Sequence, residues 1–209
     1  MDFKKVVSIS PGTTGKPVAP PGGIIKAIFS SNSQLTIEQW SRVETALQKI
    51  NNDCMGGRLV DTLRGMKVTL KHDKGIRRNG NFERGGRVLS IKDFNDTTRL
   101  ERTLLHELVH AAQPDNPDAQ LNREIEARVG TFRYTKRNEE RLPKSKIEAK
   151  YMEQIDKGMD SKYNITDPDK YSRGYERVMN FLMNNGYGDR TETAENRNFN
   201  TVKALSSDC

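Results

Sequence analysis

The chain has 209 residues, 33% of them hydrophobic, and a mean hydropathy of −0.82, which fits one folded domain with polar margins but not two full cores. No apolar run approaches the roughly 18 residues that a membrane-spanning helix needs, and Met1 to Lys5 lack the apolar core of a signal peptide, so we expect a soluble protein. The net charge of +7 would suit nucleic acid, but basic and acidic residues alternate along the chain without a basic stripe interleaved with aromatics, which argues against that partner.

The first third of the chain predicts a leader, a helix and a strand. Residues 10–23 are rich in proline and glycine, which favours a flexible or extended leader over residues 1–34. Thr36 and Gln39 open a helix whose apolar residues recur at helical spacing and are expected in the core: Ile37, Trp40, Val43, Leu47 and Ile50. Residues 66–70 alternate between apolar and polar, which indicates a half-buried strand, and His72 is expected at the surface at a strand end.

A second strand, Val88–Ile91, is followed by the best-marked helix of the chain. Asp96, Thr97 and Thr98 offer N-cap oxygens, and Thr98 with Glu101 predicts a capping box. A turn cluster containing two prolines predicts that the helix ends near Gln113. Its apolar stripe is Leu100, Leu104, Leu108 and Ala111.

This helix contains the run His106-Glu107-Leu108-Val109-His110. At about 100° per residue, the two histidines lie about 40° apart on one face, with Glu107 about 100° round from His106. Two histidines one turn apart can bind one zinc ion, and the glutamate can take a proton from metal-bound water. With only three histidines in the chain, chance would produce the pattern about three times in a thousand. The alternative is an ordinary core helix with two partly exposed histidines.

A catalytic zinc ion needs a third protein ligand and an open position for water. No histidine follows His110, so the ligand is expected to be a carboxylate or a cysteine. A second helix is predicted to begin near Asp118, and Glu124 and Glu126 lie on either side of its apolar stripe. Periodicity alone does not choose between these two glutamates.

The two motifs together resemble the glutamate zincins, in which a second helix donates a glutamate to the metal. The Arg-Glu-x-x-Ala pattern is similar to membrane-anchored metallopeptidases that process prenylated or misfolded proteins, and Glu-Ile-x-Ala to the mitochondrial peptidase of ATP synthase assembly. Both resemblances imply His106, His110 and Glu124 as zinc ligands. The chain departs from the membrane-anchored family at Arg128, where that family has an aspartate that holds a ligating histidine. In size and single domain the chain resembles the compact NleD-type effector proteases.

The zincin resemblance also implies a compact α+β fold with a small, mostly antiparallel sheet, an active-site helix, a second ligand-bearing helix and a helical C-terminal part. In zincins the strand before the active helix borders the cleft and pairs with an extended peptide, which predicts residues 87–92 as the open edge. Residues 146–157 and a helix opened by Asp167-Pro168 complete the domain. Because zinc peptidases commonly stabilise the oxyanion with a Tyr, His or Arg, the candidates are Tyr171, Arg173 and Tyr175. Amphipathic core packing is the alternative for both tyrosines.

We therefore expect one zincin-like domain over residues 35–188 and a loosely ordered tail over residues 189–209. The expected function is a zinc-dependent endopeptidase that uses Glu107 as base on an extended protein substrate, with a secreted or injected effector as one form. The alternative is an inactive zincin-fold module that binds a protein or nucleic acid. Cys54 and Cys209 are too few for a disulfide framework and suit a reducing compartment, although export stays open.

Overall fold

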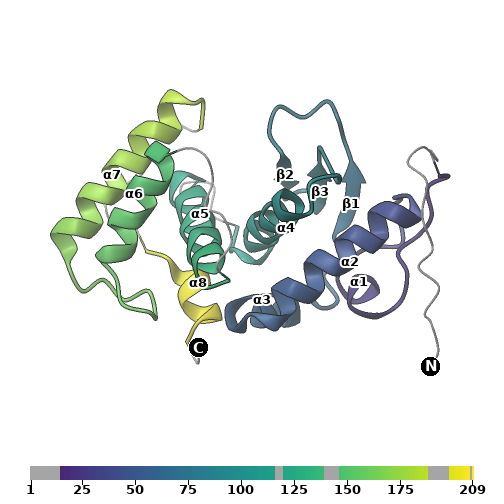
Figure 1. The fold of residues 1–209 in the computed structure, drawn as a ribbon, viewed down its shortest axis with the longest axis horizontal. Helices are drawn as coiled ribbons and strands as arrows, with labels where there is room; N and C mark the ends of the chain where they lie inside the picture. Colours follow the sequence, from purple (N-terminus) through teal and green to yellow (C-terminus); the bar gives the residue numbers. More distant parts are fainter. Residues whose placement is uncertain (1–14, 116–119, 139–145, 188–197, 208) are drawn as a thin grey trace, which may run out of the picture.

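The computed structural model describes residues 15–115, 120–138, 146–187, 198–207 and 209. In these ranges the chain forms eight helices and one three-stranded sheet, which confirms the expected α+β class (Figure 1). The pattern did not predict helices α1, α3 and α8 or strand β2. The elements in chain order are α1 (Gly23–Ile28), α2 (Ile37–Asn52), α3 (Cys54–Leu63), β1 (Thr69–His72), β2 (Gly80–Glu83), β3 (Val88–Ile91), α4 (Thr97–Ala112), α5 (Gln120–Arg137), α6 (Lys146–Lys157), α7 (Pro168–Asn184) and α8 (Asn200–Leu205).

The sheet is mixed, and β3 is its middle strand. It runs parallel to β1 and antiparallel to β2, with Gly80 opposite Ile91, so the expectation of a mostly antiparallel sheet is wrong. The prediction that Arg87 to Lys92 form the open edge is also wrong, because both sides of β3 are paired. The edge strand that packs against α4 is β2. It escaped prediction because Phe82 is the only large apolar residue among its four.

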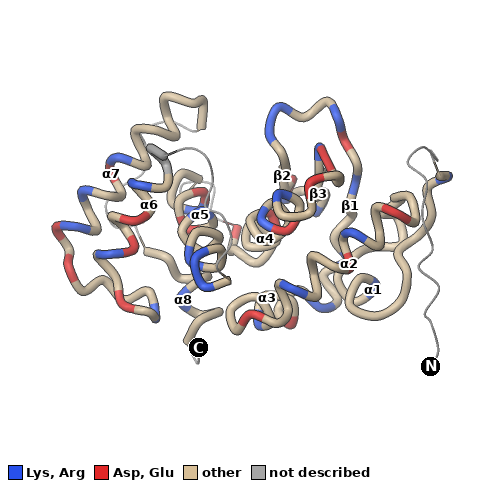
Figure 2. Tube along the Cα trace, viewed as in Figure 1, with Lys and Arg blue, Asp and Glu red and all other residues tan. Residues whose placement is uncertain are grey.

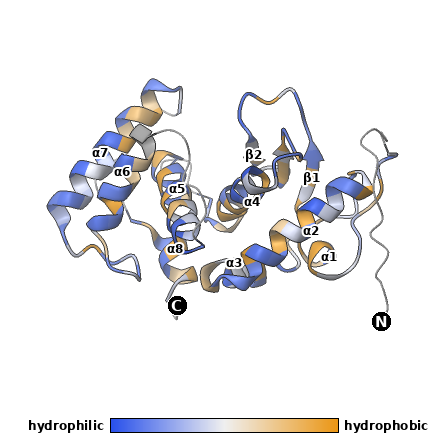
Figure 3. Ribbon diagram, in the orientation of Figure 1, coloured by the Kyte–Doolittle hydropathy of each residue, from blue (hydrophilic) through white to orange (hydrophobic). Residues whose placement is uncertain are grey.

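Helix α4 lies at the centre of the domain and packs against α2, α3, α5, β2 and β3. Its predicted apolar stripe is buried, from Leu100 to Ala111, and so are the expected core residues of α2 except one. Ile37 is 74% exposed, because it occupies the first turn of α2, beyond the edge of the core. Figure 3 shows hydrophobic and hydrophilic residues alternating along α2 and α3, as expected of helices with one buried face. Helices α6 and α7 pack against each other and against α5 (Figure 1).

Both chain margins pack more tightly than the pattern suggested. Residues 15–34 include α1, whose Ile25 and Ile28 are fully buried, so this part of the predicted leader belongs to the core. In the predicted tail, Phe199 and Val202 of the α8 region are also buried. These segments escaped prediction because each is short and has too few apolar residues to show a period. Residues 1–14 and 188–197, which carry the rest of both predictions, lie outside the described residues.

A disulfide joins Cys54, at the start of α3, to Cys209, with their Cα atoms 5.7 Å apart. The two cysteines are 155 residues apart in sequence, so spacing alone could not pair them. Two cysteines are too few for a disulfide framework, and the sequence pattern did not predict this single bond. The bond also links the segment after α8 to the start of α3, which lies 155 residues earlier in the sequence.

Candidate metal centre

The N-terminus of α4 is set by one of the three predicted caps. The Asp96 carboxylate accepts a hydrogen bond from the Arg99 amide at 2.9 Å. The predicted capping box of Thr98 and Glu101 does not form, because the Glu101 carboxylate is buried, accepts from the Tyr134 hydroxyl at 2.6 Å and pairs with a lysine. The helix ends at Ala112 with Gln113 as C-cap, as predicted.

Three side chains from α4 and α5 converge on one point. His106 Nε2 lies 3.1 Å from His110 Nε2, His110 Nε2 lies 3.1 Å from Glu124 Oε2, and His106 Nε2 lies 3.5 Å from Glu124 Oε1. A tetrahedral zinc ion with bonds of 2.0–2.2 Å holds its ligand atoms about 3.3 Å apart. The three donor atoms therefore have the spacing and the chemistry of one face of a tetrahedral site, and can hold such an ion.

Glu107 lies beside this cluster and is 6% exposed. A Cβ atom on Gly80 of β2 would lie 2.8 Å from Glu107 Oε1, so the strand backbone packs directly on the carboxylate. Burial raises the pKa of Glu107, and the nearby His106 and His110 oppose that rise. A carboxyl group with a raised pKa is a better proton acceptor than an exposed one.

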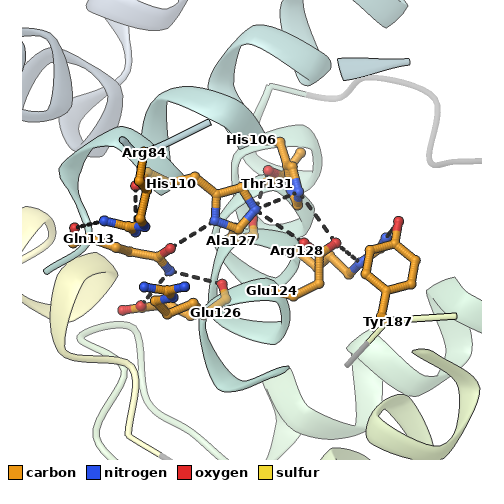
Figure 4. A network of polar contacts seen from close by, with 11 residues as sticks. Arg84, His106, His110, Gln113, Glu124, Glu126, Ala127, Arg128, Thr131 and Tyr187 are labelled. Carbon is orange, nitrogen blue, oxygen red and sulfur yellow. Dashed lines mark hydrogen bonds and ion pairs between the residues drawn. The ribbon is translucent and has the colours of Figure 1, made fainter. Parts of the chain in front are cut away.

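Gln113 holds His110 from behind, as Figure 4 shows. Its Oε1 lies 2.8 Å from His110 Nδ1, so the ring donates at Nδ1 and keeps Nε2 as an acceptor toward the cluster. The Gln113 amide group donates to Glu126 Oε2 at 2.7 Å and to the Arg123 carbonyl at 2.9 Å. This chain fixes the tautomer and the orientation of one candidate ligand.

Helical periodicity did not choose between Glu124 and Glu126 as the third ligand. In the structure the two side chains face different partners. Glu124 faces the histidines, whereas Glu126 faces Gln113 and accepts hydrogen bonds from the first amides of α8, at Thr201 and Val202. Glu126 thus connects α8 to the environment of the metal centre without contributing an atom to the three-residue cluster. Its position is structural, whereas Glu124 lies within 3.1–3.5 Å of the two histidine Nε2 atoms and is the better candidate for the third ligand.

Arg128 stands where the membrane-anchored family has an aspartate that holds a ligating histidine. In this structure Arg128 contacts Glu124 instead of a histidine. Its Nε donates to Glu124 Oε1 at 2.7 Å, and its Nη2 donates to the Tyr187 hydroxyl at 2.8 Å (Figure 4). Burial acts to raise the pKa of Glu124, but His106, His110 and Arg128 outweigh it and hold that pKa well below the usual value. The carboxylate is therefore ionised and oriented, as a metal ligand must be.

The three predicted oxyanion residues lie away from this centre. Tyr175 is buried and donates to Asn122 Oδ1 at 3.0 Å, Tyr171 packs on Phe199, and Arg173 is exposed on α7. None of the three lines the cavity at the metal centre. The helical spacing of the two tyrosines therefore reflects their packing in the core against α5 and the α8 region.

A cavity of about 980 Å³ opens over the cluster, bordered by β2, α4, α5 and the segment after α7. Tyr187 lines it, with the Arg78 guanidinium 3.3 Å from its ring centre. Sequence reasoning missed Tyr187 because it follows the end of α7 and belongs to no periodic pattern. Tyr187 and the arginines that line the cavity carry hydrogen-bond donors there.

No protein-family model matches the chain, and neither the curated proteins nor the solved structures contain a match. The described helices all fall short of the combined length and apolarity that a membrane crossing requires.

Proposed function

We propose that this protein is a zinc-dependent endopeptidase of the glutamate-zincin type. The proposal depends on one observation: His106, His110 and Glu124 present three donor atoms at tetrahedral spacing, with a buried carboxylate beside them. Histidine nitrogen with one carboxylate oxygen is a common ligand set of catalytic zinc. The resemblance of the two motifs to glutamate zincins supports the same assignment.

The chain's own residues divide the work of peptide hydrolysis. A zinc ion bound by the three ligands would polarise the scissile carbonyl and lower the pKa of water. Glu107 accepts the proton of the attacking water and passes it to the leaving amine nitrogen. Arg128 and Gln113 keep the ligands oriented, and Tyr187 with the cavity arginines supplies donors toward the developing negative charge.

The substrate binds as an extended chain along β2. The Lys92 amide donates to the Asn79 carbonyl, and alternation along an antiparallel pair then turns the backbone groups of Gly80 and Phe82 to the open edge. Both residues line the cavity over the cluster. A peptide added to this edge passes directly over the metal centre.

The disulfide supports an exported form of this peptidase. A bond between Cys54 and Cys209 persists in oxidising compartments and is rare in the cytosol. Titration of free thiols in protein purified under non-reducing conditions tests this part of the proposal, since two free thiols would contradict it.

Glu107→Gln is the variant that tests the activity. It removes the base but keeps the volume and leaves the three ligands in place, so we expect full zinc content and loss of hydrolysis. The measurement is proteome-wide mapping of new N-termini produced by the parent protein and not by the variant. Glu153→Gln, on the exposed side of α6 and outside the cavity, is the matched control. Equal cleavage by the parent and Glu107→Gln would refute the base, and a parent without zinc would refute the metal site.

A further inference from the structure

The cavity over the metal centre gathers an unusual set of basic residues. The chain has 17 lysines and 18 arginines, yet no lysine lines this cavity in the described part of the chain, whereas seven arginines do. These arginines come from the loop before β2, the turn after it, α4 and α5, and they are Arg77, Arg78, Arg84, Arg99, Arg102, Arg123 and Arg128. Although basic and acidic residues alternate along the sequence, the fold therefore brings these arginines together around one cavity.

The arginines flank the metal centre on both sides along α4. Arg102 and Arg99 precede His106 by about one and two helical turns. At the other end, Arg84 donates to the carbonyl oxygens of His110 and Gln113 at 2.8 and 2.7 Å, which holds its guanidinium at the C-terminus of α4. A chain lying over the metal centre thus meets positive charge before and after the scissile bond.

The positive charge exceeds what the cavity's own carboxylates can balance. Among the described residues, three acidic ones line the cavity, and two of them, Glu107 and Glu124, belong to the candidate metal centre, where a zinc ion would add two positive charges. Burial, and then the neighbouring Arg123 guanidinium, lowers the pKa of Arg84, as expected where like charges crowd. Arg99 and Arg123 each pair with an aspartate at 3.6 Å, so the cavity combines these ion pairs with a larger number of arginines than of carboxylates among the described residues that line it.

Arginine is also the residue that best recognises a carboxylate. Its planar guanidinium binds both oxygens of a carboxylate at once, and it loses less hydration than the ammonium group of lysine. Figure 2 shows basic residues on both arms of the loop between β1 and β2, but only the arm with Arg77 and Arg78 borders the cavity. Lys71 of β1 and Lys74 on the other arm of the loop lie outside it.

We infer that the cleft selects acidic segments of polypeptide, in which aspartate or glutamate side chains on both sides of the scissile bond pair with these arginines. The inference rests on the proposed peptidase function and names its substrate class. Polypeptide is favoured over nucleic acid because the open edge of β2 presents amide and carbonyl groups, which a peptide backbone matches and a sugar-phosphate backbone does not. An extended chain also places successive same-side residues about 7 Å apart, so several can meet arginines along the cleft.

Binding to zinc-loaded Glu107→Gln tests the inference without hydrolysis. The probes are a short fluorescein-labelled peptide in which glutamate alternates with alanine, the same peptide with glutamine or lysine in place of glutamate, and a labelled single-stranded oligodeoxynucleotide. At physiological ionic strength, we expect the glutamate peptide to bind about ten-fold more tightly than the glutamine peptide. Added Arg77→Gln and Arg78→Gln should remove most of that difference. The matched control is Lys71→Gln with Lys74→Gln, which removes the same charge from the other arm and should leave binding unchanged.

Each outcome of this binding experiment either supports or overturns the inference. Equal binding of the glutamate and glutamine peptides, or equal weakening by the lysine and arginine pairs, would overturn the inference. Tighter arginine-dependent binding of the oligonucleotide would replace it with a nucleic-acid partner. Arginine-dependent binding of the glutamate peptide, combined with a parent protein that cleaves no peptide, would support the preference of the cleft for acidic polypeptide and refute the proposed peptidase.

Discussion

Gly80→Ala should disable the proposed base without touching a metal ligand. The added Cβ atom would lie 2.5 Å from Thr103 Cγ2, 2.8 Å from Glu107 Oε1 and 2.9 Å from Glu107 Cγ. Carbon atoms in contact stay about 3.5–4.0 Å apart, so Thr103 and Glu107 must retreat by about 1 Å. A displacement of about 1 Å at a reacting group costs about a hundred-fold in rate, and overpacking costs about 1–3 kcal/mol of stability.

The assay is kcat/KM on a substrate identified by N-terminal mapping, together with zinc content and thermal unfolding. Gly85→Ala, in the turn that follows β2, is the matched control, because a Cβ atom there meets nothing within 4 Å. We expect the Gly80 variant to keep its zinc and its fold, lose about a hundred-fold in kcat/KM, and differ clearly from the Gly85 variant. A folded, zinc-loaded Gly80→Ala protein with parental activity would show that the contact with β2 does not position Glu107.

Three further predictions follow from the hydrogen bonds and the disulfide. Glu124→Ala should lower zinc content strongly, whereas Glu126→Ala should keep zinc but lose about 1–3 kcal/mol of stability, because it strips the acceptor from two amides of α8; metal analysis with the reverse order would reassign the ligand. Cys209→Ser should lower the free energy of unfolding by about 4–5 kcal/mol, from the entropy of closing a loop that spans 155 residues, and a thermal unfolding temperature equal to that of the parent would contradict the pairing with Cys54. Burial raises the pKa of Glu126, so in zinc-free protein its carboxyl stabilises the fold below its usual pKa and loses that contribution as the pH rises through the raised value. The parent should therefore lose unfolding free energy relative to Glu126→Gln as the pH rises, and denaturant titrations with parallel pH profiles would contradict this.

The central helix was predictable because its signals are local. Asp96 caps it, the turn cluster ends it, and the stripe from Leu100 to Ala111 has the period of one buried face. The angular separation of His106 and His110 follows from helix geometry alone. Interactions within one turn leave a readable pattern in consecutive residues.

The edge of the cleft was not predictable from the same kind of pattern. Strand β2 has almost no apolar alternation, and it forms because β3 offers it backbone partners and α4 covers Gly80. Residues 87–92 looked like the edge because they precede the active helix in sequence, but strand order depends on pairing at a distance. Similarly, the helical spacing of Tyr171 and Tyr175 is compatible both with a buried core and with a functional site. Their contacts with α5 and with the region of α8 show that they belong to the core.

By itself, the sequence determined the helix of His106, Glu107 and His110, and through it the candidate residues of the proposed zinc chemistry. Only the tertiary structure decided which glutamate completes the cluster, since Glu124 and Glu126 flank one stripe and differ in what α4 and α8 place opposite them. The same holds for the cavity arginines, which come from separate segments between residues 77 and 128 and line one cavity. Backbone hydrogen bonds and helical periods act over a few residues, whereas ligand geometry and charge density arise between elements that the fold brings together.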